Sequence, residues 1–327
     1  MAMASVGSSV KSDVLQVGDL RVYYHTPRGA VKAVDGVSFR IKRGERFGLA
    51  GESGSGKSSM ALALMRMIRA PGQIEGGEVW LDGRNVLTLG EDEMRTVRLA
   101  QMAMVAQGSM NSLNPVMRIV DQIADGYRDH GFAMTKREQD DRIGELLSRV
   151  GLRPDVARLF PHELSGGMKQ RVCIAIAISL TPKVIIADEP TSALDVVVQR
   201  QIIETLRRVQ TEIGAAVILV GHDMGLMAQS VDRLGVMYAG RLAEVAPVAE
   251  IFSNPTHPYT KLLIASLPSL AQKGEFRGIS GLPPTLIDAP PGCRFAPRCP
   301  YVTDRCHVEN PEMREVRPNV LAACHLF

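Results

Sequence analysis

Runs of apolar residues bounded by turn residues recur along the chain and predict β-strands. In residues 14–24 and 33–41, apolar side chains alternate with polar ones or are β-branched, which is typical of strands with one buried face. Residues 183–188 and 215–220 are instead continuous apolar runs, the pattern of strands that are buried on both faces of a parallel sheet. The sequence therefore predicts an antiparallel β segment near the N-terminus and a parallel sheet further along.

Helical patterns lie between these strands. Residues 59–68 follow a short predicted strand at 46–50 and are mostly apolar. Residues 138–150 carry apolar side chains three and four positions apart, and residues 198–213 connect the two buried strands. A strand–helix–strand order implies a parallel sheet with crossover helices, so the expected fold class is α/β.

Changes in composition divide the chain further. Residues 108–165 interrupt the strand pattern and predict a helical subdomain. Past residue 250 the chain is rich in proline, which predicts a separate, loop-dominated C-terminal extension over 251–327. Residues 1–13 are expected to form a flexible tail, which leaves 14–250 as the main domain.

The composition of the 327 residues is that of an ordinary globular protein, with 45% hydrophobic and 22% charged residues. A net charge of +3 is too small to indicate a nucleic-acid partner, and none is expected. The longest apolar run, 172–180, is about half of the roughly 18 residues that a membrane span needs. The N-terminus lacks a basic region followed by an apolar stretch, so we expect no secretory signal and a cytosolic chain.

The segment from Gly51 to Ser58, Gly-Glu-Ser-Gly-Ser-Gly-Lys-Ser, matches the phosphate-binding loop G-x-x-x-x-G-K-[ST] without a mismatch. It lies between a predicted strand and a predicted helix, so free N–H groups at the helix start would point at phosphate. Glycines allow the backbone to approach an anion, Lys57 offers a positive charge, and Ser58 offers a hydroxyl to Mg²⁺. A plain glycine-rich turn is the alternative, and the complete spacing argues against it. The residues predicted to bind nucleotide here are Gly51, Ser53, Gly54, Ser55, Gly56, Lys57, Ser58 and Ser59.

Two carboxylates, Asp188 and Glu189, follow the buried strand 183–188. Ligands of open α/β sheets bind at the carboxyl ends of the strands, so Asp188 is expected to hold Mg²⁺. Glu189 then points elsewhere and is a candidate general base for an attacking water. An acidic turn is the alternative for this pair taken by itself.

A second predicted anion-binding helix start is the segment Leu-Ser-Gly-Gly-Met at 164–168. Ser165 is placed as an N-cap, and Gly166 and Gly167 leave backbone N–H groups uncovered. One phosphate group needs only one such cradle. Two cradles in one chain therefore suggest two chains that share two nucleotides.

Taken together, these motifs resemble those of the ATP-binding subunits of ATP-binding-cassette (ABC) transporters. The phosphate loop, Leu-Ser-Gly-Gly, Asp188-Glu189, Ser192-Ala-Leu-Asp195 and His222 occur in that family's order, and the resemblance covers about residues 14–327. It implies a P-loop NTPase (RecA-like) parallel-sheet core, with an antiparallel β subdomain, a helical subdomain and a small cysteine-containing C-terminal extension.

The resemblance also implies roles for single residues. Gln107 would sense Mg²⁺ and the membrane partner, although Ala106 stands where the family usually has an aromatic residue. Asp195 would cross a dimer interface, and His222 would contact the γ-phosphate. Tyr24 would stack on adenine, with the adjacent Tyr23 as the alternative.

Residues 252–260 and 293–300 resemble the C-terminal extension of di- and oligopeptide importers, a subfamily that includes nickel and oligosaccharide importers. Some members hold a [4Fe–4S] cluster there, and four thiolates suit such a cluster or a structural Zn²⁺. The spacings of five, six and seventeen residues lack the C-x₂-C of common zinc sites and favour iron–sulfur. Unligated cysteines remain a third reading, and His307 and His325 are possible substitutes or neighbours. The cysteines concerned are Cys293, Cys299, Cys306 and Cys324, whereas Cys173 is expected in the core.

The function implied by the resemblance is ATP hydrolysis that powers import. The partners would be a second ATPase subunit (a heterodimer, or alternatively a homodimer), two transmembrane permeases and an extracytoplasmic solute-binding protein. The chain would be peripheral, at the cytoplasmic face of the inner membrane. The solute stays open between peptide, nickel and oligosaccharide. The alternatives are a non-transport ATPase of DNA repair or the ribosome, whose coiled coils or paired cassettes this sequence lacks, and a regulatory subunit with negligible turnover.

Overall fold

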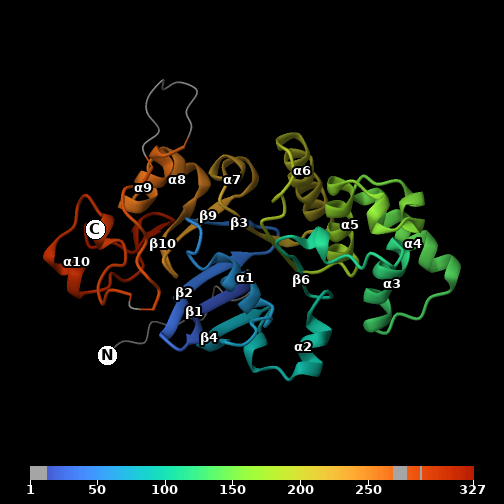
Figure 1. The fold of residues 1–327 in the computed structure, drawn as a ribbon, viewed down its shortest axis with the longest axis horizontal. Coiled ribbons are helices and arrows are strands. Elements are labelled where there is room, and N and C mark those ends of the chain that lie inside the picture. The colour runs from blue at the N-terminus through green and yellow to red at the C-terminus, as the bar shows by residue number, and fades with distance from the viewer. Residues whose placement is uncertain (1–12, 268–277, 288) are drawn as a thin grey trace. The chain divides into compact units, whose positions relative to one another are not determined.

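The computed structural model describes residues 13–267, 278–287 and 289–327. The expected tail therefore lies outside the described residues, apart from Asp13, which begins the first strand. The chain forms two compact units (Figure 1). Within the described residues, the first unit contains 13–14, 42–45 and 88–218, and the second contains 15–41, 46–87 and 219–327.

An antiparallel sheet makes up the N-terminal part of the second unit. Its strands run in the order β2-β1-β4-β5, and Leu15 of β1 lies opposite Leu81 of β4. Alternating side chains of β1 and β2 are buried, as the period-two pattern predicts. The antiparallel β subdomain is confirmed. The strands are β1 (Asp13–Thr26), β2 (Gly29–Lys42), β4 (Gly72–Leu81) and β5 (Arg84–Asn85).

A second set of strands in this unit has the order β11-β12-β10-β9-β3. β3 pairs with β9 in parallel, and the pairings from β9 to β11 are antiparallel. In the described residues, the extension expected to consist mainly of loops therefore contributes the strands β11 and β12 and the helices α9 and α10. The strands are β3 (Arg46–Ala50), β9 (Arg233–Tyr238), β10 (Arg241–Pro247), β11 (Arg314–Arg317) and β12 (Val320–Ala322).

The helices of the second unit are short. α1 begins directly at the phosphate loop and ends at Leu64, four residues before the end predicted from the apolar pattern at 59–68. The chain turns away at Arg66, whose φ of +51° is left-handed and ends the helix. These helices are α1 (Lys57–Leu64), α7 (Met224–Ser230), α8 (Val248–Ser253), α9 (Pro258–Ala265) and α10 (Asp304–Val308).

The first unit contains the buried parallel strands. β6 (Met102–Val105) and β7 (Val184–Asp188) pair in parallel, and every residue of β7 is buried. The crossover helix α6 (Val196–Ile213) leads to β8 (Ala216–Val220), as the strand–helix–strand order predicts. Ala216 at the start of β8 donates its N–H to the carbonyl of Lys183 over 2.9 Å. The boundary between the units falls inside β8, after Ile218.

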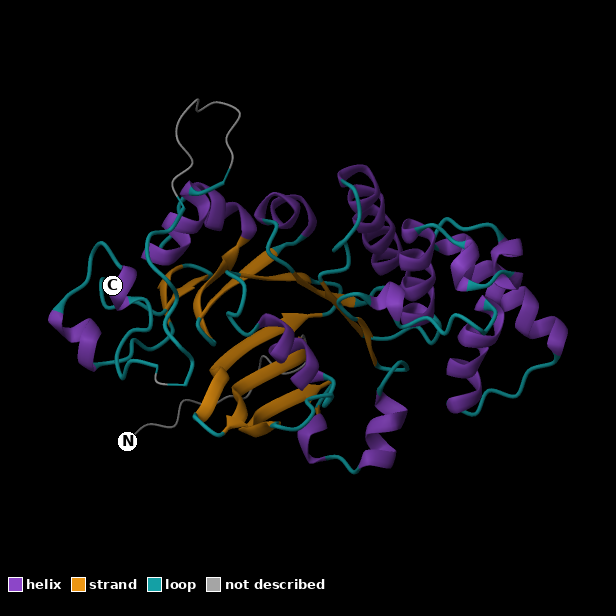
Figure 2. Cartoon of the chain, viewed as in Figure 1, coloured by secondary structure: helices purple, strands orange, loops and turns teal. Residues whose placement is uncertain are grey.

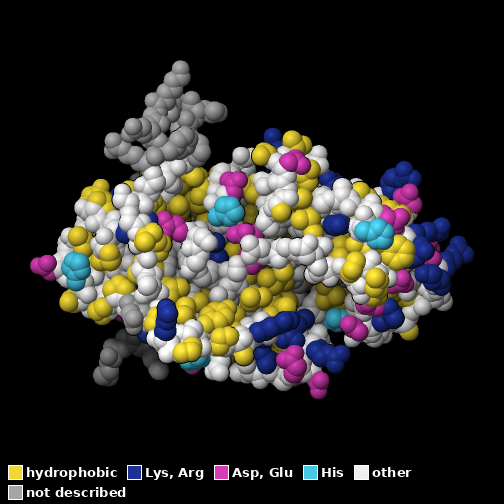
Figure 3. All heavy atoms as spheres, viewed as in Figure 1, with side chains coloured by type: hydrophobic (Ala, Val, Ile, Leu, Met, Phe, Trp, Pro, Cys, Tyr) yellow, Lys and Arg dark blue, Asp and Glu magenta, His cyan; other side chains and the backbone are white. Residues whose placement is uncertain are grey.

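The predicted helical subdomain is present in the first unit. Figure 2 shows α3, α4 and α5 as a group of helices with no strand between them. Thr135 and Glu138 form a capping box that begins α4, and the apolar side chains at 143, 146 and 147 are buried. Charged side chains gather over α4 on its outer face (Figure 3). The helices of this unit are α2 (Glu91–Val97), α3 (Ile119–Asp129), α4 (Lys136–Arg149), α5 (Gly166–Ile178) and α6.

Over the described part of the chain, no helix combines the length and the apolar character that a membrane crossing requires.

Candidate functional site

The predicted phosphate loop joins β3 to α1 in the second unit, and its glycines are sterically required. Gly51 has a φ of +149° and Gly56 a φ of +102°. A Cβ at Gly51 would lie 2.1 Å from the carbonyl oxygen of Met237, and one at Gly56 would lie 2.0 Å from that of Ala33. Both positions therefore exclude any side chain, which keeps the backbone of the loop open to an anion.

Lys57 is the first residue of α1, and its ammonium group bends back over the loop. Nζ donates to the carbonyl oxygens of Gly51 (2.9 Å) and Glu52 (2.8 Å) and to Oγ of Ser55 (3.3 Å). The side chain is buried, with 7% of the residue exposed. A positive charge held inside a ring of backbone groups at a helix start is the arrangement that binds phosphate.

The two candidate tyrosines for adenine stacking point in different directions from β1. The hydroxyl of Tyr24 lies 3.2 Å from Oγ of Ser59 in α1, so Tyr24 lies beside the phosphate loop. The hydroxyl of Tyr23 donates to a carboxylate oxygen of Asp35 over 2.7 Å. Burial and this hydrogen bond raise the pKa of Tyr23 to about 12. The geometry therefore favours Tyr24 for a role at the nucleotide.

His222 follows β8 in the second unit and is exposed. The residue before it, Gly221, donates its N–H to the carbonyl of Leu49 in β3 over 3.1 Å. His222 and the phosphate loop therefore follow the carboxyl ends of neighbouring strands, where ligands of α/β sheets bind. The next residue, Asp223, caps α7 by accepting from the N–H of Leu226.

In the first unit, the predicted acidic pair lies at the end of β7. Asp188 is the last residue of this strand and is 3% exposed. Glu189 follows with a left-handed φ of +45°. Nε2 of Gln107 donates to Oε2 of Glu189 over 2.9 Å. The structure therefore brings together two residues that the sequence separates by 82 positions.

Two helix starts meet in the first unit. Oγ of Ser165 accepts from the N–H of Met168 (3.3 Å) and caps α5, as predicted. A Cβ at Gly167 would lie 2.8 Å from a methyl group of Val198 in α6. Asp195 caps α6 by accepting from the N–H groups of Val197 (3.1 Å) and Val198 (3.0 Å). Asp195 therefore has a structural role here, which the resemblance did not indicate.

The predicted site residues divide between the units. The first unit carries the acidic pair, its glutamine and the second helix start, namely Gln107, Ser165, Gly166, Gly167, Asp188, Glu189 and Asp195. The second unit carries Tyr24, the residues from Gly51 to Ser59, His222 and the four C-terminal cysteines.

The four C-terminal cysteines line one small cavity of about 10 Å³, together with His257 and His325. All four are free thiols, and the N–H of Cys293 donates to the carbonyl of Cys306 over 2.8 Å. Burial, and the proximity of the other three thiols, raise the pKa of Cys293 to about 11. Within the described ranges, however, no group of three or more His, Cys, Asp or Glu side chains has the arrangement of a metal site. The thiols thus share a cavity but lack ligating geometry.

His257 is a residue of this cavity that the sequence reasoning did not single out. It is 3% exposed, and burial lowers its pKa to about 4. Its Nδ1 accepts from the N–H of Tyr259 over 3.0 Å, so the ring is a neutral N-cap of α9. His307 does not line the cavity, whereas His325 does.

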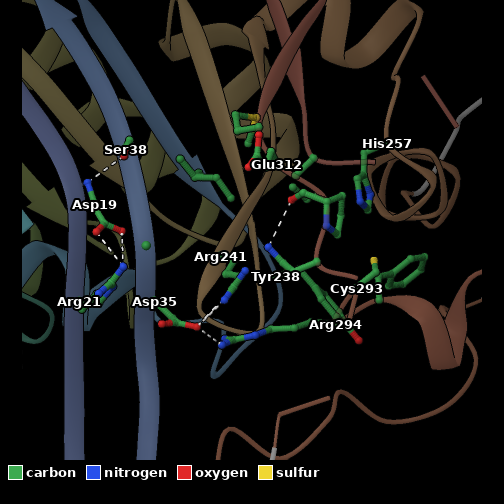
Figure 4. A pocket seen from close by; sticks show the side chains of 18 of the residues that line it. Asp19, Arg21, Asp35, Ser38, Tyr238, Arg241, His257, Cys293, Arg294 and Glu312 are labelled. Carbon is green, nitrogen blue, oxygen red and sulfur yellow. Dashed lines mark hydrogen bonds and ion pairs between the residues drawn. The ribbon is translucent and has the colours of Figure 1, made fainter. Parts of the chain in front are cut away.

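Two arginines of the segment between Cys293 and Cys299 were also missed. Figure 4 shows Arg294 and Arg241 pointing toward Asp35 at the edge of a cavity of about 510 Å³. Arg298 makes a bidentate ion pair with Glu52 of the phosphate loop, at 2.7 and 3.0 Å. No local pattern in the sequence pairs these residues; the only signal is the presence of two arginines between cysteines.

Comparison with known proteins gives matches along nearly the whole chain. The model of the ABC transporter family matches residues 34–192, and that of the oligopeptide/dipeptide transporter C-terminal region matches residues 243–306. The oligopeptide transport ATP-binding protein OppD of Salmonella typhimurium is 42% identical over 315 residues, which cover 95% of this chain and 93% of OppD. The dipeptide transport ATP-binding protein DppD of Escherichia coli is 41% identical over 317 residues (95% and 96%).

A third relative, the probable peptide ABC transporter ATP-binding protein y4tR of Sinorhizobium fredii, is 40% identical over 323 residues, covering 97% of this chain and 96% of y4tR. Among solved structures, the dimeric, post-hydrolysis form of the ATP-binding cassette MJ0796 bound to ADP and Pi superposes with a TM-score of 0.64. It is 28% identical and covers 72% of this chain and 98% of its own. These similarities confirm the expected P-loop NTPase fold.

Proposed function

This chain belongs to the ATP-binding subunits of ABC transporters, in the oligopeptide/dipeptide group, and from this premise we propose that it hydrolyses ATP to power the import of peptides. The observation that carries the proposal is that one chain combines an intact phosphate loop with the C-terminal region of this group. The relatives named for peptide transport match over more than nine-tenths of the chain. Nickel and oligosaccharide remain the alternative solutes within the same proposal.

We assign the triphosphate to the loop from Gly51 to Ser59. Lys57 would bind the β- and γ-phosphates, and Tyr24 would stack on adenine. Ser58, Gln107 and Asp188 would hold Mg²⁺, which neutralises charge on the phosphates. The steric requirement for glycine at 51 and 56 and the inward-pointing ammonium of Lys57 support this assignment.

Hydrolysis is assigned to Glu189, Gln107 and His222. Glu189 would accept a proton from the attacking water, and the amide of Gln107 holds its carboxylate in one direction. His222 would donate a hydrogen bond to the γ-phosphate as negative charge develops on it. A regulatory subunit without turnover would have no need for this set of groups.

A second ATPase subunit is proposed to complete each nucleotide site. The helix start at Ser165, Gly166 and Gly167 would bind the γ-phosphate of ATP held by the partner. Beside Asp195, the apolar side chains of Val196 and Val197 are 80% and 67% exposed, which suits a surface that a partner covers. The partner is proposed to be a different ATPase chain, and a second copy of this chain is the alternative.

The remaining partners follow from import. Two transmembrane permeases would form the pathway, a solute-binding protein outside the membrane would deliver the peptide, and this chain would bind peripherally at the cytoplasmic face. The chain has no proposed contact with the solute, because its recognition belongs to those partners.

The four C-terminal cysteines are proposed to hold a [4Fe–4S] cluster, with Zn²⁺ as the alternative. Support comes from the single cavity that the four thiols line; they lack ligating geometry as they stand, so a bound metal would have to draw them together. When bound, a cluster would supply a redox-active crosslink of this segment, whereas zinc would supply a crosslink alone.

The test is ATP turnover by the whole importer, purified with its permeases in lipid vesicles. We expect the binding protein loaded with a short peptide to stimulate phosphate release. If nickel or an oligosaccharide stimulates phosphate release and peptide does not, that compound would replace peptide as the proposed solute. An absence of ATP turnover in the complex under every condition would overturn the proposal itself.

A further inference from the structure

The guanidinium group of Arg298, in the C-terminal extension, is anchored at every donor. It makes the bidentate pair with Glu52, and its remaining N–H groups reach Oη of Tyr238 (3.2 Å) and the carbonyls of Ile279 (3.1 Å) and Ser280 (3.0 Å). The five N–H groups of an arginine are thereby all used. The side chain is 4% exposed. A planar fork fixed in this way sets both the position and the orientation of the carboxylate that it binds.

Glu52 is the residue of the phosphate loop where the internal contacts of the loop converge. Its N–H donates to the hydroxyl of Tyr259 over 2.9 Å. Its carbonyl accepts from Nζ of Lys57 (2.8 Å) and from the N–H of Ser55 (3.2 Å). A shift of Glu52 therefore displaces the ammonium group and the backbone turn that would meet the phosphates.

The hydroxyl of Tyr259 is itself held in place by packing. Tyr259 is fully buried in a cluster with Tyr238 and Phe295, whose ring centroids lie 4.6 and 5.4 Å from its own. All three rings come from residues after 237, outside the segment that carries the nucleotide motifs of this unit. The C-terminal part of the chain thus packs around the tyrosine whose hydroxyl binds the backbone of the phosphate loop.

The segment that carries Arg298 is fixed at its other end as well. Arg294, four residues earlier and 5% exposed, pairs with Asp35 of β2 (Figure 4). It also donates to the carbonyl of Ala239. The segment 294–298 is therefore attached through one arginine to β2 and through the other to the phosphate loop. One buried ion pair and one partly buried ion pair restrict it to one placement on the ATP-binding part of this unit.

We infer that Arg298 and Tyr259 are positioning residues for ATP binding: they hold Glu52, and through it Lys57, in the arrangement that receives the phosphates. The inference rests on the proposed function, in which the loop from Gly51 to Ser58 binds the triphosphate. Its physical basis is preorganisation, because a loop already fixed before binding loses less conformational freedom when ATP arrives. The C-terminal extension then contributes to ATP affinity by positioning the phosphate loop.

A purely structural role for the ion pair makes a different prediction. If Arg298 only attached the extension to the rest of the unit, its loss would lower the melting temperature and leave the ATP affinity of the folded protein unchanged. A positioning role raises the Kd for ATP at a temperature where the variant is fully folded. It also raises KM for ATP more than it lowers kcat, because saturating ATP restores the loop.

The experiment measures the Kd for MgATP by calorimetry on the full-length chain carrying Glu189→Gln, which prevents turnover. We expect Arg298→Lys and Glu52→Gln each to raise the Kd about tenfold, which is about 1.4 kcal/mol. Tyr259→Phe, which removes one hydrogen bond, is expected to raise it about threefold. The double variant Arg298→Lys/Glu52→Gln should bind no more weakly than either single one, since both remove the same contact.

Arg305→Lys is the matched control, because Arg305 lies in the same extension and pairs with Glu309 at an exposed site. Its Kd is expected to equal that of the parent protein. Lys57→Ala tests the proposed function and should abolish binding. If Lys57→Ala abolishes binding while Arg298→Lys and Glu52→Gln stay within twofold of the parent, the positioning role is wrong. If Lys57→Ala binds ATP normally, the assignment of the loop fails instead.

Discussion

Gln107 donates a 2.9 Å hydrogen bond to Glu189 across the carboxyl ends of the parallel strands β6 and β7. Glu189 has a left-handed φ of +45°, and the amide of Gln107 fixes where its carboxylate points.

From this relationship we predict that Glu189→Gln binds ATP but releases phosphate at least about 100-fold more slowly, because an amide cannot accept the proton of the attacking water. Gln107→Leu should retain more activity, about a tenth of the parent rate, since the carboxylate remains but loses its orientation. Phosphate release at saturating ATP measures both. Near-normal turnover by Glu189→Gln would remove this residue as the base.

The glycines of the phosphate loop give a second prediction. Gly51→Ala and Gly56→Ala place a Cβ about 2 Å from a backbone oxygen, so the loop must distort, and we expect ATP binding to be lost. Unfolding free energy should fall by about 1–3 kcal/mol. Gly76→Ala is the control, because a Cβ there meets nothing within 4 Å and its φ is not left-handed. ATP binding by Gly56→Ala at the parent affinity would contradict this account of the loop.

The parts of the site that the sequence predicts are those encoded locally. The phosphate loop and the N-cap at Ser165 are runs of a few residues whose chemistry depends on spacing alone. The bond between Arg298 and Glu52 spans 246 positions and has no periodic or motif signature, so only the folded chain reveals it. The cap made by Asp195 was overlooked because the resemblance gave that residue another role.

In the fold as well, elements with strong local sequence signals were predicted, whereas those that depend on tertiary pairing were not. The buried strand at 184–188 and the crossover helix were predicted because long apolar runs and helical periodicity are strong signals. The strands β11 and β12 were missed: they are four and three residues long and are separated by Pro318-Asn319. They form because β10 offers an open edge, with Val245 opposite Leu321, and such tertiary pairing overrides weak local preference.

A third prediction concerns Asp35, which is shared by two arginines and is 7% exposed. Asp35→Asn leaves Arg241 and Arg294 facing each other without a carboxylate, so we expect the unfolding free energy at pH 7 to fall by about 3 kcal/mol. Asp19→Asn is the control, because Asp19 pairs with Arg21 at a surface where both side chains are about half exposed. Urea unfolding measures both, and equal losses for the two variants would contradict the prediction.

The effect of Asp35 should depend on pH. Burial by itself would raise the pKa of Asp35, but hydrogen bonds from Tyr23 and Arg241 and the charges of Arg241 and Arg294 lower it overall. A lowered pKa in the folded state means that the stabilisation is present above the unfolded pKa of about 3.9 and is lost as the pH falls through the folded value. The difference between the parent and Asp35→Asn should therefore shrink below about pH 4. A difference that stays constant from pH 7 to pH 3 would show that the carboxylate charge is not its source.

The last prediction joins the cysteines to the ATP site. Cys299 directly follows Arg298, so a metal or cluster bound at the four cysteines would fix the residue next to the one that holds Glu52. By linkage, loading that site should tighten ATP binding, and the same coupling free energy should tighten metal binding when ATP is present. The Cys299→Ser variant, purified anaerobically, should contain less iron or zinc than the parent protein by elemental analysis. It should also bind ATP several-fold more weakly than the parent.

The coupling should require the arginine. In the Arg298→Lys background, Cys299→Ser should still lower the metal content but leave the Kd for ATP unchanged, because the connection to Glu52 is already broken. Cys173→Ala serves as the control, since Cys173 belongs to the other unit. It is buried in α5, where its thiol donates a hydrogen bond to the carbonyl of Ser109. Protein that contains neither iron nor zinc would overturn the metal site and leave the positioning role of Arg298 standing. An ATP affinity that changes with metal content to the same extent in both backgrounds would overturn the coupling through Arg298.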